Sequence, residues 1–146
     1  MKGIINLQVN NIYNEDCLVG LKKIPDNYID LVVIDPPYDI CTKGSKKETG
    51  RLCHDLTKLE NELKENNLVN GYDLSILDEL IRVMKEINIY IWCNDRQIPT
   101  YMKYFAEQGC KLEIIIWGKT KPMPLYSNKY LGDKEYCLHF RKNGNI

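Results

Sequence analysis

The feature that most constrains the fold is an apolar run that stops at two consecutive prolines. Residues 29–34 read Ile-Asp-Leu-Val-Val-Ile, and Asp35-Pro36-Pro37-Tyr38 follows directly. A short, nearly continuous apolar run of this kind is typical of a strand buried on both faces, as in a parallel sheet. Proline fixes φ and lacks a backbone N–H. We therefore expect a buried strand that ends in a stiff corner.

The rest of the chain alternates between strand-like and helix-like segments. Residues 87–93 and 112–117 resemble the first strand in character, residues 136–140 predict a fourth strand, and residues 11–13 predict a short fifth. Apolar residues at helical spacing predict helices after Asn14, over 74–87 and over 98–106. Pro99 suits a first helical turn and Gly109 a C-terminal cap, and Asp73 or Ser75 can cap the middle helix. This order predicts a three-layer α/β fold with a mainly parallel sheet and an antiparallel pair at one edge.

Composition excludes a few classes of protein. The chain has 146 residues, 44% of them hydrophobic, and its 20 basic and 20 acidic residues cancel. We expect one globular domain, and net charge gives no indication of a nucleic-acid partner. No signal peptide or membrane-spanning run is present, which predicts a cytoplasmic protein with reduced cysteines and no membrane partner. Cys53-His54 has no second ligand pair at zinc spacing, so we assign no metal site.

Residues 39–70 interrupt the alternation. The first part of this stretch is polar and basic, and a long excursion after a buried strand is often functional. Its cations either belong to a solvated loop or contact phosphates, and the same two alternatives hold for the weaker pair Lys119 and Lys121. We treat 39–70 as a mobile or target-contacting insertion in a single domain spanning 1–146. The candidate nucleic-acid contacts are Lys43, Lys46, Lys47, Arg51 and Lys119.

The corner at Asp35 combines groups that suit one kind of chemistry. Its carboxylate and the prolyl carbonyls can accept hydrogen bonds, and the Tyr38 ring can stack on a planar base. Two such acceptors can bind the two hydrogens of an exocyclic amino group and localise the nitrogen lone pair. A methyl group opposite that lone pair can then be attacked. The alternative is that Asp-Pro-Pro only terminates a strand in a tight turn.

The corner and its flanks resemble the DNA adenine-N6 and cytosine-N4 methyltransferases. The motif Asp35-Pro36-Pro37-Tyr38 matches their catalytic motif, and the preceding Tyr13-Asn14-Glu15-Asp16-Cys17 and Ile24-Pro25-Asp26 match the stretch before it. Later segments also correspond: Leu80 to Lys85 with Ile89 to Trp92, then Ile116 to Lys119, and Glu135 to Leu138. The resemblance covers nearly the whole chain except residues 40–70. It implies a Rossmann-like methyltransferase fold.

The resemblance also implies roles for particular residues. Asp35 to Tyr38 would hold the amino group of a base flipped out of duplex DNA, and aspartate at the first position favours adenine. Asp16 and Cys17 match positions that contact the adenine of S-adenosylmethionine, although Asp16 can equally be a helix N-cap. Trp92 and Trp117 are expected to be core residues rather than base platforms.

One part of the family pattern is missing. We find no Phe-x-Gly-x-Gly segment, where glycine lets the backbone approach the methyl donor, because the closest glycines are six residues apart. We therefore expect an incomplete fold that carries the catalytic half and does not transfer methyl groups alone. The chain is a fragment, a natural truncation or one subunit of a split enzyme, with a second polypeptide or a homo-oligomer at the exposed sheet edge. The alternatives are a methyltransferase for RNA or protein amides, and a nucleic-acid-binding remnant without catalysis.

Overall fold

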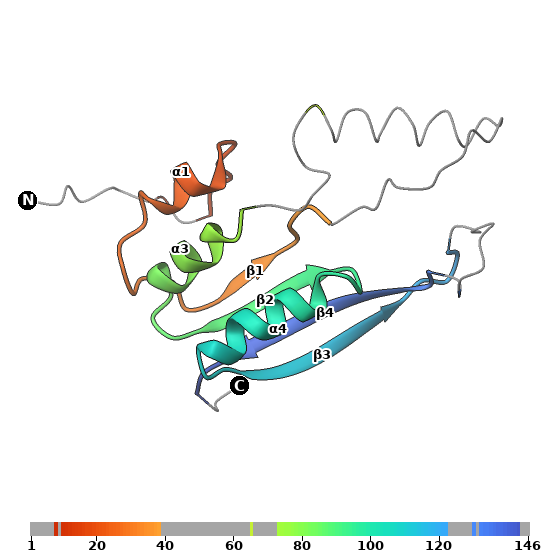
Figure 1. The fold of residues 1–146 in the computed structure, drawn as a ribbon. Coiled ribbons are helices and arrows are strands. Elements are labelled where there is room, and N and C mark those ends of the chain that lie inside the picture. The colour runs from red at the N-terminus through yellow and green to blue at the C-terminus, as the bar shows by residue number, and fades with distance from the viewer. Residues whose placement is uncertain are drawn as a thin grey trace, which may run out of the picture.

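The computed structural model describes residues 8, 10–38, 65, 73–122, 130 and 132–143. A short helix α1 (Cys17–Leu21) precedes strand β1 (Val32–Ile34). Helix α3 (Ser75–Val83), strand β2 (Asn88–Cys93) and helix α4 (Ile98–Glu107) follow. Two longer strands, β3 (Lys111–Gly118) and β4 (Lys134–Arg141), complete the described elements (Figure 1). None of these helices is long and apolar enough to cross a bilayer.

The four strands form one sheet in the order β1-β2-β4-β3. β1 pairs with β2 in parallel, so the carboxyl ends of these strands lie together. β4 pairs antiparallel with β2 on one side and with β3 on the other. The expected antiparallel pair at one edge is therefore confirmed. We expected a mainly parallel sheet. The observed sheet is mixed, because among the described strands parallel pairing is confined to β1 and β2.

The core lies between this sheet and helices α3 and α4, which cover the same face (Figure 1). Leu77 and Leu80 of α3 and Tyr101 and Phe105 of α4 are buried against the sheet. The buried strand positions alternate along β2, as the period of two requires: Ile89, Ile91 and Cys93. Burial raises the pKa of the Cys93 thiol to about 12, and Cys137 is buried as well. Both cysteines are thus confirmed as small buried apolar residues.

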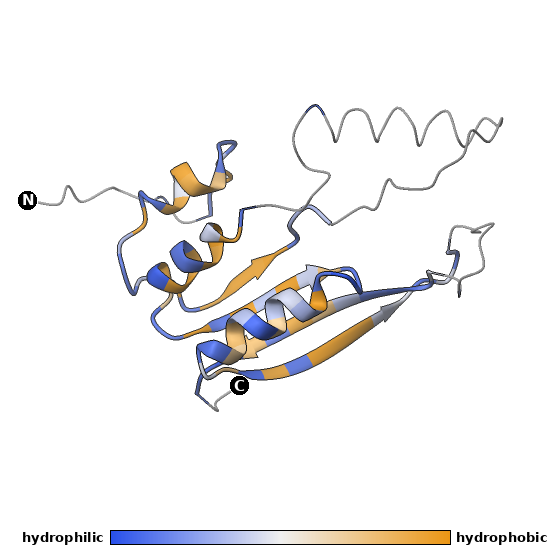
Figure 2. Ribbon diagram, in the orientation of Figure 1, coloured by the Kyte–Doolittle hydropathy of each residue, from blue (hydrophilic) through white to orange (hydrophobic). Residues whose placement is uncertain are grey.

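Two sequence expectations about burial are wrong. Val33 in β1 is 61% exposed and Trp117 in β3 is 55% exposed, although both runs predicted strands buried on both faces. The reason is that β1 and β3 are the outer strands of the described sheet, whose described helices cover one face. Figure 2 shows the resulting apolar stretches along both outer strands. The short strand expected at 11–13 is also absent: these residues have no regular structure, and Ile12 is 94% exposed.

The helix ends agree with the sequence. Pro99 lies in the first turn of α4, and Gly109 follows that helix with a φ of 73°, a conformation that glycine adopts without a steric penalty. The N-cap position of α3 is Leu74, and Asp73 just before it accepts a hydrogen bond from the backbone N–H of Ser75 at 3.0 Å. The helix expected after Asn14 is confirmed as the five-residue α1.

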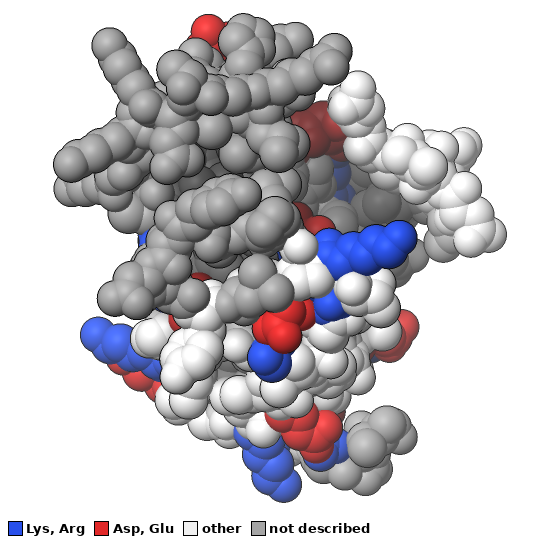
Figure 3. Space-filling view, turned by 90° about the vertical axis from the view of Figure 1, so that its right-hand side faces the viewer, with Lys and Arg blue, Asp and Glu red and all other residues white. Residues whose placement is uncertain are grey.

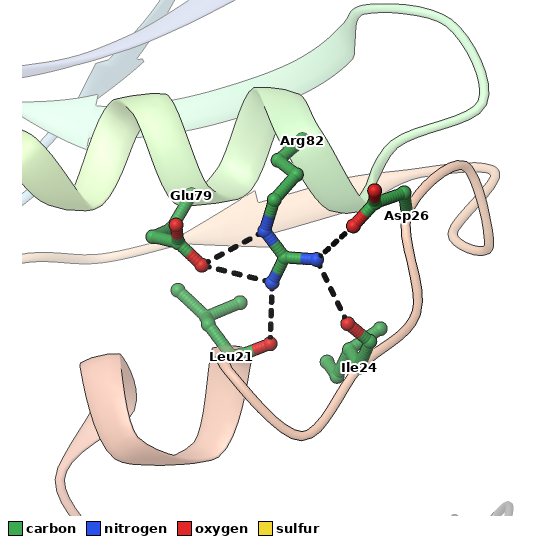
Figure 4. Close-up of polar contacts among 5 residues, drawn as sticks. All are labelled: Leu21, Ile24, Asp26, Glu79 and Arg82. Atoms are coloured by element: carbon green, nitrogen blue, oxygen red, sulfur yellow. Dashed lines mark hydrogen bonds and ion pairs between the residues drawn. The ribbon is translucent and has the colours of Figure 1, made fainter. Parts of the chain in front are cut away.

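A single arginine ties the segment around α1 to α3 (Figure 4). Arg82 donates to the backbone carbonyls of Leu21 at 2.9 Å and Ile24 at 3.0 Å. Its guanidinium also pairs with Glu79 at 2.8 Å and with Asp26 at 2.5 Å. These partners engage all sides of the planar guanidinium, which has donors in a fixed geometry. The loop between α1 and β1 is thereby held against α3.

Candidate active site

The diproline corner begins where β1 ends, at the carboxyl end of the sheet. The last ladder pair joins Ile34 to Ile91, after which Pro36 and Pro37 supply no backbone donors. Asp35 is exposed, and the two prolines are half-buried. The corner thus presents its carboxylate away from the core, at the position where open α/β sheets bind ligands.

A hollow of about 290 Å³ lies beside Asp35. Its walls come from the ends of all four described strands and are formed by Val33, Ile34, Asp35, Trp92, Trp117 and Glu135. The two indoles meet edge to face, with ring centroids 6.2 Å apart and an interplanar angle of 80°. A carboxylate next to two aromatic rings can bind a planar ring that carries hydrogen-bond donors. The volume is at the lower end of the range for ligand pockets, which suits a single base.

Tyr38 lies next to Asp35. Its side chain is half-buried, and burial is the main reason why the pKa of its phenol is raised. The negative charge of Asp35 adds to this rise, followed by that of Glu135, and the phenol also interacts with the Asp35 carboxylate. The phenol therefore stays neutral at physiological pH. The structure thus brings the carboxylate and the aromatic ring of the predicted motif together.

The Pro37 carbonyl is engaged within the protein. The side-chain amide of Gln97 donates to this carbonyl oxygen at 3.1 Å. Gln97 is 8% exposed and lies in the turn between β2 and α4. The expectation that the prolyl carbonyls serve a ligand is therefore corrected for Pro37, whose oxygen already has a buried donor. Pro36 is then the prolyl carbonyl to consider for a ligand.

Asp16 and Cys17 lie at the start of α1. The Asp16 carboxylate accepts a hydrogen bond from the backbone N–H of Val19 at 3.1 Å, so Asp16 is an N-cap. Both residues are exposed. A capping oxygen leaves the second carboxylate oxygen accessible, so the cap and the predicted donor contact are compatible.

The predicted cations are only partly described. Lys119 pairs with Glu135 at 2.5 Å, which places it beside the hollow and neutralises one of the acidic walls. The predicted contacts Lys43, Lys46, Lys47 and Arg51 lie outside the described residues, as does Cys53-His54. Figure 3 shows acidic and basic side chains interspersed over the described part of one side of the molecule. That part therefore has no concentrated basic patch on this side.

Four residues of the site were missed or misjudged from the sequence. Trp92 and Trp117 were expected in the core, but both line the hollow: Trp92 is half-buried, and Trp117 is exposed because it lies on an outer strand. From the sequence, Glu135 was named only as part of a segment that resembles the family. The feature that indicates it is a charged residue at the start of a strand that lies next to an aromatic-rich strand. Gln97 had no motif. Its position just after β2, whose carboxyl end lies beside the corner, is the only indication in the sequence.

The chain is similar to known proteins over most of its length. The family model described as DNA methylase matches residues 29–146. Among curated proteins, the type II methyltransferase M.HinfI of Haemophilus influenzae is 32% identical over 94% of the chain and 38% of its own length. The type II methyltransferase M.BglII of Bacillus subtilis is 30% identical over 92% of the chain and 36% of its own length.

A third curated relative and a solved structure agree with this match. The type II methyltransferase M2.MboI of Moraxella bovis is 26% identical over 93% of the chain and 51% of its own length. The crystal structure of an M1.HpyAVI–SAM complex matches 89% of the chain and 53% of that protein, with a TM-score of 0.55 and 21% identity. This structure supports the fold assignment. The chain thus spans between about a third and a half of the proteins it matches.

Proposed function

Because the chain belongs to the DNA methylase family, we propose that it is the catalytic half of an S-adenosylmethionine-dependent DNA amino-methyltransferase with adenine N6 as its target. The observation that carries this proposal is the hollow beside Asp35, with two indoles and a carboxylate on its walls. The relatives are type II methyltransferases by name, the matching family model is described as DNA methylase, and the hollow has the size and chemistry for a base.

The base enters the hollow with its ring against the indoles and its amino group toward Asp35. One N–H donates to the Asp35 carboxylate and the other to the Pro36 carbonyl. Both acceptors pull the amino nitrogen toward a tetrahedral arrangement, which frees its lone pair from the ring. Duplex DNA buries its bases, so the target nucleotide is first rotated out of the stack. With the donor bound, the new N–C bond would form as the methyl–sulfur bond breaks and its electron pair stays on the donor sulfur; the carboxylate would stabilise the positive charge on nitrogen until one amino proton passes to solvent.

Tyr38 completes the contacts to the base. Because its phenol stays neutral, the ring can stack on the base without adding a negative charge next to the phosphates. Its interaction with Asp35 orients the carboxylate. Lys119 pairs at 2.5 Å with Glu135, which lines the hollow, and is proposed to contact a backbone phosphate of the flipped nucleotide. The cations of the 39–70 insertion are proposed to contact phosphates farther along the DNA.

The methyl donor needs more protein than the described site supplies. S-adenosylmethionine provides an electrophilic methyl group when it is bound. Asp16 has an exposed carboxylate that can bind a hydroxyl or amino group of the donor, with Cys17 beside it. The hollow of about 290 Å³ accommodates a base but not the donor in addition. We therefore propose that a longer chain, or a second polypeptide, completes the donor site.

The remaining assignments follow from this function. We propose that 1–146 form one partial domain in the cytoplasm, with DNA as its partner and no membrane association. Residues 39–70 are its target-contacting insertion. The outer edge of β1, where Val33 is 61% exposed, is the edge on which the completing part of the sheet, or another copy of the chain, pairs.

Methyl transfer tests the proposal. The chain is assayed with labelled S-adenosylmethionine on DNA, RNA and protein, both alone and mixed with a polypeptide that contains the remaining part of a relative such as M.HinfI. We expect transfer to adenine in DNA in the mixture, and we expect Asp35→Ala to remove it while leaving thermal unfolding unchanged, because Asp35 is exposed. Transfer that survives in Asp35→Ala, or transfer only to RNA or protein, would contradict the proposal.

A further inference from the structure

The corner that carries Asp35 cannot be fixed by the sheet ladder. Parallel pairing between β1 and β2 ends at Ile34 and Ile91. After Asp35, Pro36 and Pro37 have no N–H with which to extend the ladder. Fixing the corner relative to the sheet therefore requires a donor from another segment, aimed at one of its carbonyls.

Gln97 supplies this donor. It follows β2 in a turn of which Asn94 is the first residue, and its side-chain nitrogen lies 3.1 Å from the Pro37 carbonyl oxygen, an ordinary hydrogen-bond distance. The amide oxygen accepts from the backbone N–H of Asn94 at 3.3 Å. A backbone N–H only donates and a carbonyl only accepts, so these two partners fix the orientation of the amide. Gln97 is 8% exposed, which protects both bonds from competition with water.

The turn itself is held by further bonds. The Asn94 side chain accepts from the backbone N–H groups of Arg96 at 3.1 Å and Gln97 at 3.3 Å. The Gln97 carbonyl accepts from Thr100 at 3.1 Å and Tyr101 at 3.2 Å, at the start of α4. Tyr101 is 1% exposed and its hydroxyl lies 3.5 Å from the Gln97 nitrogen. Gln97 thus connects the corner to a rigid helix start in the core.

We infer that Gln97 is a positioning residue for methyl transfer: it fixes the diproline corner, and with it the Asp35 carboxylate and the Pro36 carbonyl, through its bond to Pro37. The inference rests on the proposed function for its catalytic consequence. Gln97 does not contact the base, so its loss leaves DNA affinity nearly unchanged. Loss of Gln97 lets the two acceptors move relative to the amino group, and small misplacements of this kind lower the rate by up to about a hundred-fold.

Two variants and one control isolate this bond. Gln97→Met keeps an unbranched side chain of similar length and removes the hydrogen bonds to Pro37, Asn94 and Tyr101. Gln97→Glu keeps the acceptor for Asn94 and, when ionised, cannot donate to Pro37. Gln108→Glu makes the same change just after the other end of α4, away from the corner. Thermal unfolding verifies that each variant is folded, and Gln97→Met covers the case in which the buried charge of Gln97→Glu prevents folding.

The first measurement is the steady-state kinetics of methyl transfer by the chain supplied with its completing half. We expect both Gln97 variants to lower kcat by roughly ten- to a hundred-fold with KM for DNA within about two-fold of the unmodified protein. Protonation lets a glutamic acid donate, and burial raises its pKa, so Gln97→Glu recovers part of its kcat as the pH falls. Gln97→Met and Gln108→Glu show no such recovery. A general loss of folded protein cannot produce this pattern.

The second measurement does not depend on activity. NMR relaxation dispersion at the Pro36 and Pro37 carbonyl carbons and the Tyr38 amide reports microsecond-to-millisecond motion. We expect flat profiles in the unmodified chain and in Gln108→Glu, and exchange confined to the corner in Gln97→Met. If the unmodified protein transfers no methyl group, the proposed function fails while exchange in Gln97→Met still supports the positioning role. Flat profiles in Gln97→Met, or unchanged kcat in an active enzyme, would overturn it.

Discussion

At the scale of single residues, the chemistry of the corner could be predicted and its surroundings could not. Asp35 and Tyr38 follow from the sequence because proline restricts φ wherever it occurs, so Pro36 and Pro37 determine a local shape without tertiary information. Trp117 could not be assigned in this way. An apolar run has the same pattern whether its strand is central or outer, and only the observed pairing shows that β3 is outer and Trp117 is 55% exposed.

Trp117 therefore gives a prediction about base binding. Trp117→Ala should weaken the binding of an adenine-containing oligonucleotide by about 1–3 kcal/mol, because the hollow then has one stacking surface fewer. The free energy of unfolding should fall by only about 1 kcal/mol, since the indole is half exposed and its removal breaks an edge-to-face pair with Trp92. Fluorescence anisotropy and urea unfolding measure the two quantities.

Tyr28→Ala provides the matched control for this comparison. Tyr28 is 48% exposed, similar to Trp117, but it precedes β1 and so lies at the opposite end of that strand from Asp35. The Tyr28→Ala substitution should leave oligonucleotide binding unchanged. An equal loss of affinity in both variants would mean that Trp117 does not form part of a base site.

At the scale of elements, the helices and strands follow from periodicity, but their connections do not. Arg82 lies on α3, and the partners that tie it to the segment after α1 are 56 to 61 residues away in sequence. No local pattern indicates contacts over such a separation. The expected strand at 11–13 failed for a related reason: an apolar and aromatic triplet forms a strand only where a neighbouring strand is available to pair with it.

The Arg82 network predicts a large effect from a small change. Arg82→Lys should lower the free energy of unfolding by about 2 kcal/mol, because an ammonium group cannot bind Glu79, Asp26 and two backbone carbonyls in the same fork geometry. Lys85→Gln is the control, since the Lys85–Asp30 pair is more than half exposed and should contribute less than about 1 kcal/mol. Urea unfolding compares them, and a loss no larger in Arg82→Lys than in Lys85→Gln would show that the network is not structural.

At the scale of the whole molecule, the class of fold was predictable from the sequence. Alternating segments predicted an α/β fold, the family resemblance implied an incomplete Rossmann-like sheet, and the mixed sheet β1-β2-β4-β3 agrees with both, with the described helices on one face. The exposure of Val33 and Trp117 could not be derived, because it depends on which strands lie beyond the described edges. The same arrangement fits the proposal that the hollow holds the base and that further protein completes the donor site.

The most direct test of this account is to titrate the isotopically labelled chain with two nucleosides that differ only in the exocyclic amino group. Deoxyadenosine should shift the indole N–H resonances of Trp92 and Trp117, the only two tryptophans in the chain, in a saturable way. Purine deoxyriboside, which lacks the amino group, should bind about ten-fold more weakly, and Asp35→Ala should remove this difference because it deletes the charged acceptor. Equal affinities for the two nucleosides, or a preference that survives in Asp35→Ala, would contradict the claim that the diproline corner holds the amino group of the base.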